Sequence, residues 1–227
     1  MNTERAEPDL ESWPLIGEDT MQELILWDVR LEGGRPAGEE VKEVNEWVPL
    51  DYAIAWAVWK SGQYGGDVSL TIMAHGYEPR TGFLAGTRST PGNTLPQRNE
   101  DGGVIPQPTA TGLLGVYSQG GGGIQFCRDG ILLGTIHQFE KLKGKVKLIE
   151  ILGCGAAYIT PGFEGRDGDG NLLCYRLAQI TQAYVRASTA TQWFDPTPVI
   201  DFGRWEGTVI TYAPNGGLAK VQYAPPR

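Results

Sequence analysis

The hydrophobic and polar positions of this chain form continuous apolar runs that are separated by stretches with helical spacing. Apolar runs at residues 23–31, 68–76 and 146–154 predict strands, and so does the segment 184–189. Runs of this kind are typical of strands that are covered on both faces, as in a parallel sheet. We therefore expect a buried and mostly parallel sheet at the centre of the molecule.

Two helices are predicted between these strands. Residues 51–60 are rich in alanine and apolar on most sides, with Asp51 near the N-cap. Residues 171–182 carry leucine and isoleucine at helical spacing, and Asp169 or Asn171 can cap that helix. The order of strands and helices along the chain predicts an α/β fold.

The last part of the chain predicts a C-terminal β-hairpin. Residues 207–212 and 220–223 read as strands, and a Pro-Asn-Gly-Gly turn at 214–217 separates them. We expect this hairpin at the edge of the sheet.

The remaining segments define the domain organisation. Residues 1–20 are acidic and show no hydrophobic period, which indicates a flexible N-terminal arm. Residues 21–227 then form a single domain, with a long insertion at 77–123 that is rich in glycine and proline. Long loops are often functional, and this one directly follows His75-Gly76, so we expect it to act as a lid beside the site.

Composition narrows the classes of function. The 227 residues carry a formal net charge of -8, which argues against nucleic acid as a partner. No apolar run is long enough to span a membrane, and the first residues do not resemble an export signal. Three cysteines are an odd number, so a disulfide scaffold is not expected and a cytoplasmic location is favoured.

The strongest chemical signal comes from the ends of two predicted strands. Residues 68–76 end in Ala74-His75-Gly76, and residues 146–154 end in Gly153-Cys154. The carboxyl ends of strands in open α/β sheets border the ligand crevice, where a histidine can activate a thiol nucleophile. The amides of Gly76 and Cys154 can then hold the oxyanion that develops on an attacked carbonyl. These residues predict acyl transfer through Cys154, with His75 as the base.

The other candidate groups receive structural interpretations. His137 is expected on the surface, and Cys127 and Cys174 are expected in the core. No pair of cysteines or histidines has zinc-ligand spacing, and the loop 164–170 lacks the closing glutamate of an EF-hand. We therefore expect neither a metal nor a cofactor.

At these positions the chain resembles the caspase-like clan of cysteine peptidases, which includes caspases, metacaspases, clostripain and gingipains. The resemblance rests on two apolar blocks in the same order, residues 72–76 ending in His-Gly and residues 149–154 ending in Gly-Cys. It extends over roughly residues 23–194 and is closest to bacterial caspase-like domains. It implies a three-layer sandwich and a His75–Cys154 dyad that forms an acyl-enzyme with a peptide or protein substrate.

Two departures from the caspase pattern limit what the resemblance implies. The spacing from His75 to Cys154 is much longer than the caspase spacing of about 50 residues, because of the insertion. The sequence Leu152-Gly153-Cys154-Gly155 replaces the caspase signature Gln-Ala-Cys-x-Gly, so caspase specificity does not carry over. Three acidic residues after the cysteine could instead favour a basic substrate side chain: Glu164, Asp167 and Asp169.

The sequence therefore predicts a cysteine endopeptidase of caspase-like type that acts on peptide or protein substrates. The alternative is a catalytically inactive relative that serves as a protein-interaction module. Seven tryptophans favour that alternative, because exposed aromatic residues often anchor partner proteins. A partner protein or an activator is compatible with both interpretations.

Overall fold

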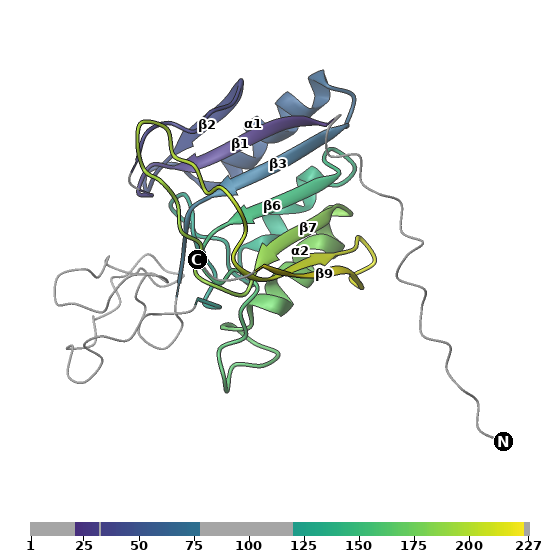
Figure 1. The fold of residues 1–227 in the computed structure, drawn as a ribbon. Helices are drawn as coiled ribbons and strands as arrows, with labels where there is room; N and C mark the ends of the chain where they lie inside the picture. The colour runs from purple at the N-terminus through teal and green to yellow at the C-terminus, as the bar shows by residue number, and fades with distance from the viewer. Residues whose placement is uncertain (1–20, 32, 78–119, 225–227) are drawn as a thin grey trace.

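The computed structural model of the protein describes residues 21–31, 33–77 and 120–224. Its main feature is a seven-stranded sheet with the strand order β2-β1-β3-β6-β7-β8-β9 (Figure 1). The five strands from β2 to β7 in this order run parallel, whereas β8 and β9 are antiparallel to their neighbours. The predicted α/β class with a mostly parallel central sheet is confirmed.

The elements that build this sheet and its cover follow one another closely along the chain. In chain order they are β1 (Gln22–Asp28), β2 (Glu40–Val44), α1 (Leu50–Gln63), β3 (Val68–Met73), β4 (His75–Gly76), β5 (Ile124–Gln125), the 3-10 helix η2 (Ile136–Leu142), β6 (Leu148–Leu152), α2 (Gly170–Thr181), β7 (Tyr184–Ser188), β8 (Gly207–Tyr212) and β9 (Leu218–Ala224). The expected arm at 1–20 and most of the expected insertion at 77–123 lie outside the described residues.

The continuous apolar runs occupy the centre of the sheet, as their composition requires. Every residue of β3 is buried, since β1 and β6 flank it and side chains cover it above and below. The chain leaves β1 toward β2 on one side and returns to β3 on the other side. The order of strands therefore reverses between β1 and β3, which is where open α/β sheets form their crevice.

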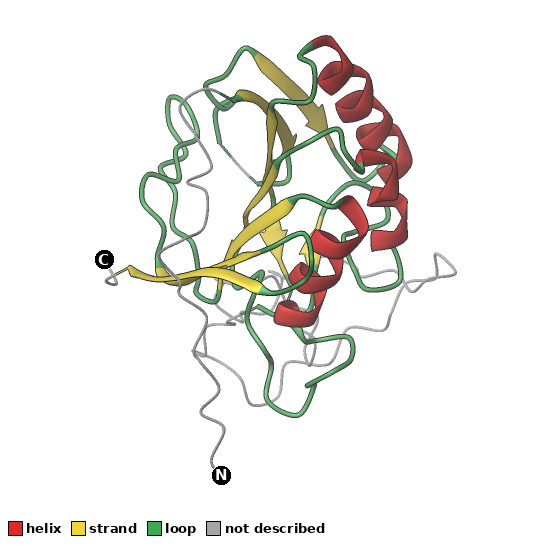
Figure 2. Cartoon of the chain, turned by 90° about the vertical axis from the view of Figure 1, so that its right-hand side faces the viewer, coloured by secondary structure: helices red, strands yellow, loops and turns green. Residues whose placement is uncertain are grey.

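One face of the sheet is covered by helices (Figure 2). The larger of two hydrophobic clusters joins α1, η2 and α2 to the inward side chains of β1, β3, β6 and β7. α1 contributes Leu50, Ala53, Ile54 and Ala57, whereas α2 contributes Leu173, Leu177 and Ala178. These positions recur every three or four residues, so each helix turns one apolar stripe toward the sheet.

The opposite face of the sheet is covered by a loop. The segment between β7 and β8 crosses in front of the strands in Figure 1 and packs Ile200 and Phe202 on Ile25, Trp27 and Met73. Among the described residues no helix lies on this side. The three-layer arrangement that we expected is therefore not confirmed, because a loop takes the place of the second helical layer.

Two local details differ from the sequence-based expectation. The edge strand β2 was not predicted, because Glu40–Val44 carries charges at three of its five positions. Helix α1 begins at Leu50 with Pro49 as its N-cap, so Asp51 lies in the first turn and does not cap the helix. The carboxylate that accepts the Leu50 amide comes instead from Asp129, at 2.9 Å.

Candidate active site

The two predicted catalytic residues follow neighbouring strands. β3 and β6 are parallel, with Met73 opposite Leu152, and the Ala74 amide continues this pairing by donating to the Leu152 carbonyl at 3.3 Å. β3 ends at Met73 and β6 ends at Leu152, so His75 and Cys154 each follow the end of one of two neighbouring parallel strands by two residues.

The residues that precede His75 and Cys154 face the helix side of the sheet. Ala74 precedes His75 and belongs to the helix-side cluster, and Gly153 precedes Cys154. A Cβ atom on Gly153 would also point toward this cluster. It would lie 3.4 Å from the Ile124 side chain and 2.9 Å from the Ala74 carbonyl oxygen. The thiol of Cys154 contacts the backbone of Gln192, which belongs to the segment that covers the other face of the sheet.

The imidazole of His75 has a backbone partner. Its Nε2 atom lies 3.2 Å from the carbonyl oxygen of Arg30, which follows β1 across the strand-order reversal. A carbonyl can only accept a hydrogen bond, so this contact places the proton of a neutral ring on Nε2. Nδ1 is then the nitrogen that can accept a proton.

Arg30 is itself held by a buried carboxylate. Asp28 is 1% exposed, and its Oδ1 accepts from the Arg30 backbone amide at 3.1 Å and from Arg30 Nε at 2.8 Å. Its Oδ2 accepts from Arg30 Nη2 and from the Cys127 amide, while the Cys127 carbonyl accepts from the same Nη2 at 2.7 Å. This arrangement fixes the backbone that presents the Arg30 carbonyl to His75.

The thiol of Cys154 is buried, with 9% of the residue exposed. Its Sγ donates to the carbonyl oxygen of Gln192 at 3.6 Å. Burial raises the pKa of Cys154 to about 11, and the charge of Glu206 acts in the same direction. The thiol is therefore protonated near neutral pH in this arrangement, and a base must remove its proton before it can attack.

Gln192 is positioned by Glu206 on the loop side of the sheet. The Gln192 side chain donates to the Glu206 carbonyl at 3.0 Å and accepts from the Glu206 amide at 3.1 Å. These two hydrogen bonds hold the segment between β7 and β8 next to the Cys154 thiol.

The amides that we expect to hold the oxyanion belong to Gly76 and Cys154. Gly76 pairs with Ile124 in the antiparallel pair β4–β5, while the neighbouring Tyr77 amide donates to the Gly123 carbonyl. Bonded and non-bonded pairs alternate in antiparallel pairing, so the Gly76 amide points away from β5. Gly120 packs against the other donor residue: a Cβ there would lie 2.5 Å from the Cys154 carbonyl.

The three acidic residues expected to bind substrate divide into two groups. Glu164 and Asp167 are exposed in the loop before α2. Asp169 is 7% exposed and caps α2: it accepts from the Leu172 amide at 2.9 Å and from the Gly165 amide at 2.8 Å. Capping by Asp169 is one of the two alternatives predicted from the sequence.

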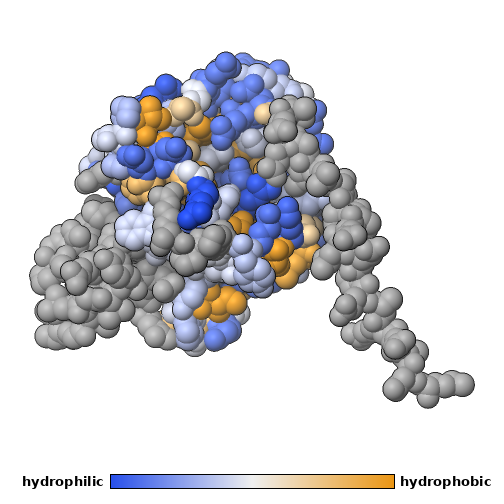
Figure 3. All heavy atoms as spheres, viewed as in Figure 1, coloured by the Kyte–Doolittle hydropathy of each residue, from blue (hydrophilic) through white to orange (hydrophobic). Residues whose placement is uncertain are grey.

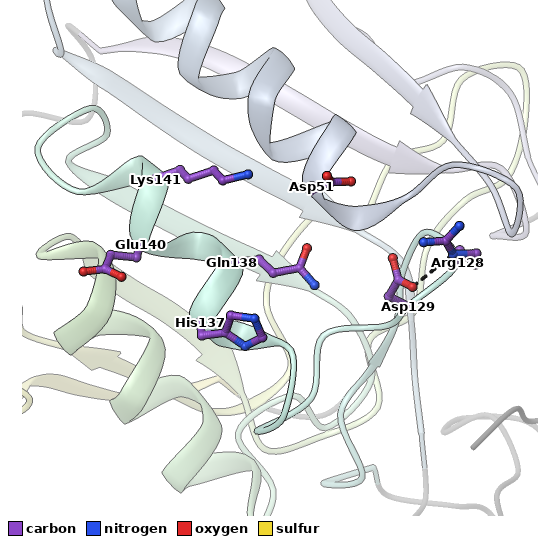
Figure 4. Close-up of a pocket in the computed structure, with 7 residues that line it drawn as sticks. All are labelled: Asp51, Arg128, Asp129, His137, Gln138, Glu140 and Lys141. Carbon is purple, nitrogen blue, oxygen red and sulfur yellow. Dashed lines mark hydrogen bonds and ion pairs between the residues drawn. The ribbon is translucent and has the colours of Figure 1, made fainter. Parts of the chain in front are cut away.

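The remaining candidate residues are one histidine and two cysteines. His137 is exposed and borders a hollow of about 660 Å³ between η2, the start of α1 and the turn at Arg128-Asp129 (Figure 4). None of the predicted catalytic residues lines this hollow. Cys127 and Cys174 are buried in the helix-side cluster, as expected. Burial raises the pKa of both thiols strongly.

Two properties of the described residues complete the account of the site. In residues 21–31, 33–77 and 120–224, no group of three or more His, Cys, Asp or Glu residues is placed to hold a metal ion. Neither α1 nor any other described helix is long and apolar enough to cross a membrane. Comparisons with protein-family models, curated proteins and solved structures find no match.

Reasoning from the sequence missed the groups that contact His75 and Cys154 or hold those contacts in place. Asp28 and Arg30 lie in the second half of the first predicted strand, residues 23–31, and β1 ends at Asp28. Charged residues near the carboxyl end of an apolar run were therefore a usable signal. Gln192 and Glu206 lie in the long connection between β7 and β8, and nothing in their local sequence indicates a contact with Cys154.

Proposed function

We propose that the protein is a cysteine endopeptidase of caspase-like type, acting through His75 and Cys154. The observation that carries this proposal is the pairing of β3 and β6, because both residues leave adjacent parallel strands at the same register. The reversal of strand order beside β3 and the Arg30 carbonyl at the imidazole support it.

In the first half of the reaction, His75 takes the thiol proton of Cys154 as Sγ attacks the carbonyl carbon of a peptide bond. The new carbon–sulfur bond leaves negative charge on the carbonyl oxygen, which the Gly76 and Cys154 amides stabilise. When the carbon–nitrogen bond breaks, His75 returns the proton to the leaving amine. The acyl group remains on Cys154 as a thioester.

In the second half, His75 takes a proton from a water molecule that attacks the thioester. The carbon–sulfur bond breaks, the carboxylic acid leaves, and the proton returns to the sulfur. The Arg30 carbonyl keeps the imidazole oriented through both steps, because it fixes the ring by its Nε2 hydrogen bond. Asp28 acts one step further away, as a positioning residue for Arg30.

The raised pKa of Cys154 gives substrate binding a part in activation. In the free protein the thiol donates to Gln192 and is protonated. A peptide carbonyl that enters beside Sγ takes the place of that contact and allows the proton to pass to His75. In this proposal, substrate binding assists the formation of the nucleophile near neutral pH.

The finer features of the proposal follow the caspase-like type. They are a sandwich around the parallel strands, in which the β7–β8 loop covers one face, and a C-terminal hairpin formed by the antiparallel pair β8 and β9. The cysteines Cys127, Cys154 and Cys174 are all free, which supports the cytoplasm as the location.

A second candidate function is a catalytically inactive interaction module. Two observations favour it: the thiol is buried, and several large aromatic residues are exposed. Trp47 is 74% exposed, and Trp59 is 59% exposed on the outer side of α1. Solvent-facing tryptophans are frequent anchors in protein interfaces.

Hydrolysis of a broad fluorogenic peptide library separates the two functions. The wild type is expected to cleave peptides, whereas Cys154→Ala abolishes turnover and His75→Ala lowers it by at least about 100-fold. The double variant should lose no more than Cys154→Ala alone, because the two residues act as one unit. His137→Ala, which alters the exposed histidine, is the matched control and should retain wild-type turnover. Peptide cleavage that survives Cys154→Ala, or no cleavage by any form of the protein, contradicts the peptidase.

A further inference from the structure

A second hollow lies on the loop-covered face of the sheet. It has a volume of about 600 Å³ and is bounded by the strands β1, β3 and β6 and by the segment between β7 and β8. The strands contribute Ile25, Met73 and Leu152, and the loop contributes Gln192, Ile200 and Phe202. Where described residues are visible in Figure 3, this side of the molecule intermixes apolar and hydrophilic residues.

Three lining residues connect the hollow to the candidate nucleophile. Leu152 precedes Cys154 by two residues, and Met73 precedes His75 by two residues. The backbone carbonyl of Gln192, the third, accepts a hydrogen bond from the Cys154 thiol. A substrate residue bound at the thiol can therefore place its side chain over Leu152 and Met73.

The chemistry of the wall nearest the thiol is apolar. Met73, Leu152 and Phe202 present hydrocarbon, sulfur and an aromatic ring. The first acid reached along β6 is Glu150, which lies roughly 13 Å from Cys154 along the strand and is paired with Arg186 at 3.0 Å. Apolar walls favour apolar side chains, because every charged group that enters them loses its hydration.

Most charged residues of the hollow are exposed: Glu23, Asp195, Asp201 and Arg204. Glu150 is half-buried and paired with Arg186. Neither Glu164 nor Asp167, the exposed acids expected to attract a basic side chain, lines the hollow.

We propose that this hollow is the primary specificity pocket, and that it takes a large apolar side chain, leucine, methionine or phenylalanine, from the residue whose carbonyl Cys154 attacks. This inference rests on the proposed peptidase function and adds the class of substrate to it. It replaces the basic side chain that the acidic residues after Cys154 had suggested.

The test uses fluorogenic peptides that differ only in the residue before the cleaved bond. We expect kcat/KM for leucine, methionine and phenylalanine to exceed that for arginine, lysine and aspartate by at least about tenfold. This profile is measured on the wild-type protein, so its outcome does not depend on how a variant folds.

Leu152→Asp then tests the position of the pocket. The half-buried leucine forms the wall nearest the thiol, so the change should lower kcat/KM for leucine peptides by at least about tenfold and raise it for arginine peptides. Leu218→Asp is the matched control, because Leu218 is 53% exposed on the edge strand β9 and should leave the profile unchanged.

The outcomes separate this inference from the function on which it rests. Cleavage that depends on Cys154 but prefers arginine, lysine or aspartate overturns the apolar pocket and leaves the peptidase intact. An unchanged profile in Leu152→Asp, with the preference retained, places the pocket elsewhere. If no peptide is cleaved and no peptidyl ketone labels Cys154, the peptidase and the pocket fail together.

Discussion

The two faces of the central sheet are built in different ways. On the helix side, α1, η2 and α2 bury a continuous cluster against the strands. On the loop side, a smaller cluster leaves a hollow of about 600 Å³, and Gln192 in its lining accepts a hydrogen bond from the Cys154 thiol through its backbone carbonyl. The comparison suggests a division of labour: the helix side supplies stability, and the loop side supplies the space and the chemistry of the site.

The largest difference in turnover is expected between two single variants, each with a cysteine replaced by alanine. Cys154→Ala should lower turnover more than about 1,000-fold with little change in stability. Cys174→Ala, within the helix-side core, should leave turnover near wild type and lower the free energy of unfolding by about 1–2 kcal/mol. Peptide hydrolysis and urea unfolding of the two variants measure both quantities. Comparable losses of turnover in both variants would contradict the assignment of stability to the helix side and of chemistry to the loop side.

Alkylation by iodoacetamide sharpens the comparison among the thiols. Because burial raises the pKa of Cys154 to about 11, its thiolate fraction and its labelling rate should increase about tenfold per pH unit from pH 7 to pH 10. Cys127 and Cys174 should react more slowly at every pH, since burial raises their pKa values further. Labelling rates are followed for each cysteine by peptide mass spectrometry. A Cys154 rate that levels off below pH 9 would show that the pKa is not raised.

Two ion pairs at different places on the sheet test the role of Asp28. Asp28→Asn removes the charge that holds Arg30, so it should lower kcat/KM about tenfold and the free energy of unfolding by about 3 kcal/mol. Glu40→Gln removes the partner of Lys60 beside the edge strand β2 and should leave kcat/KM unchanged. A positioning role also predicts that the loss in Asp28→Asn falls on kcat rather than on KM. An equal effect of both variants on kcat would contradict the positioning role of Asp28.

The smallest effect on turnover is expected from a helix-side position of β6. Ile151 is fully buried among the helices, and Ile151→Ala should cost about 2–5 kcal/mol of unfolding free energy while the folded protein remains active. Leu152→Ala, one residue further along, should cost only about 1 kcal/mol because that side chain is half-buried beside the hollow. Urea unfolding compares the two, and a larger loss in Leu152→Ala would reverse the assignment of faces.

The sequence predicts the elements whose composition reflects their own burial. β3 and β6 are continuous apolar runs, and α2 has a helical stripe with Asp169 as its cap. Elements that depend on distant partners were missed. The strand β2 is charged because it lies at an edge, and the carboxylate at the start of α1 comes from Asp129, far along the chain.

The same distinction applies to the candidate site. His75 and Cys154 stand at strand ends, which local patterns locate. The Arg30 carbonyl, the Gln192 carbonyl and the loop that forms the hollow approach them only through tertiary folding. A backbone carbonyl can also belong to any residue type, so no sequence motif marks it.

Covalent labelling with a peptidyl chloromethyl ketone tests the joint action of His75 and Cys154 most directly. The reagent alkylates an activated thiol, and peptide mass spectrometry identifies which of the three cysteines carries the label. We predict selective labelling of Cys154 in the wild type, and a loss of that labelling in His75→Ala while the fold is retained. Equal labelling in His75→Ala, or equal labelling of Cys127 and Cys174, would contradict the account.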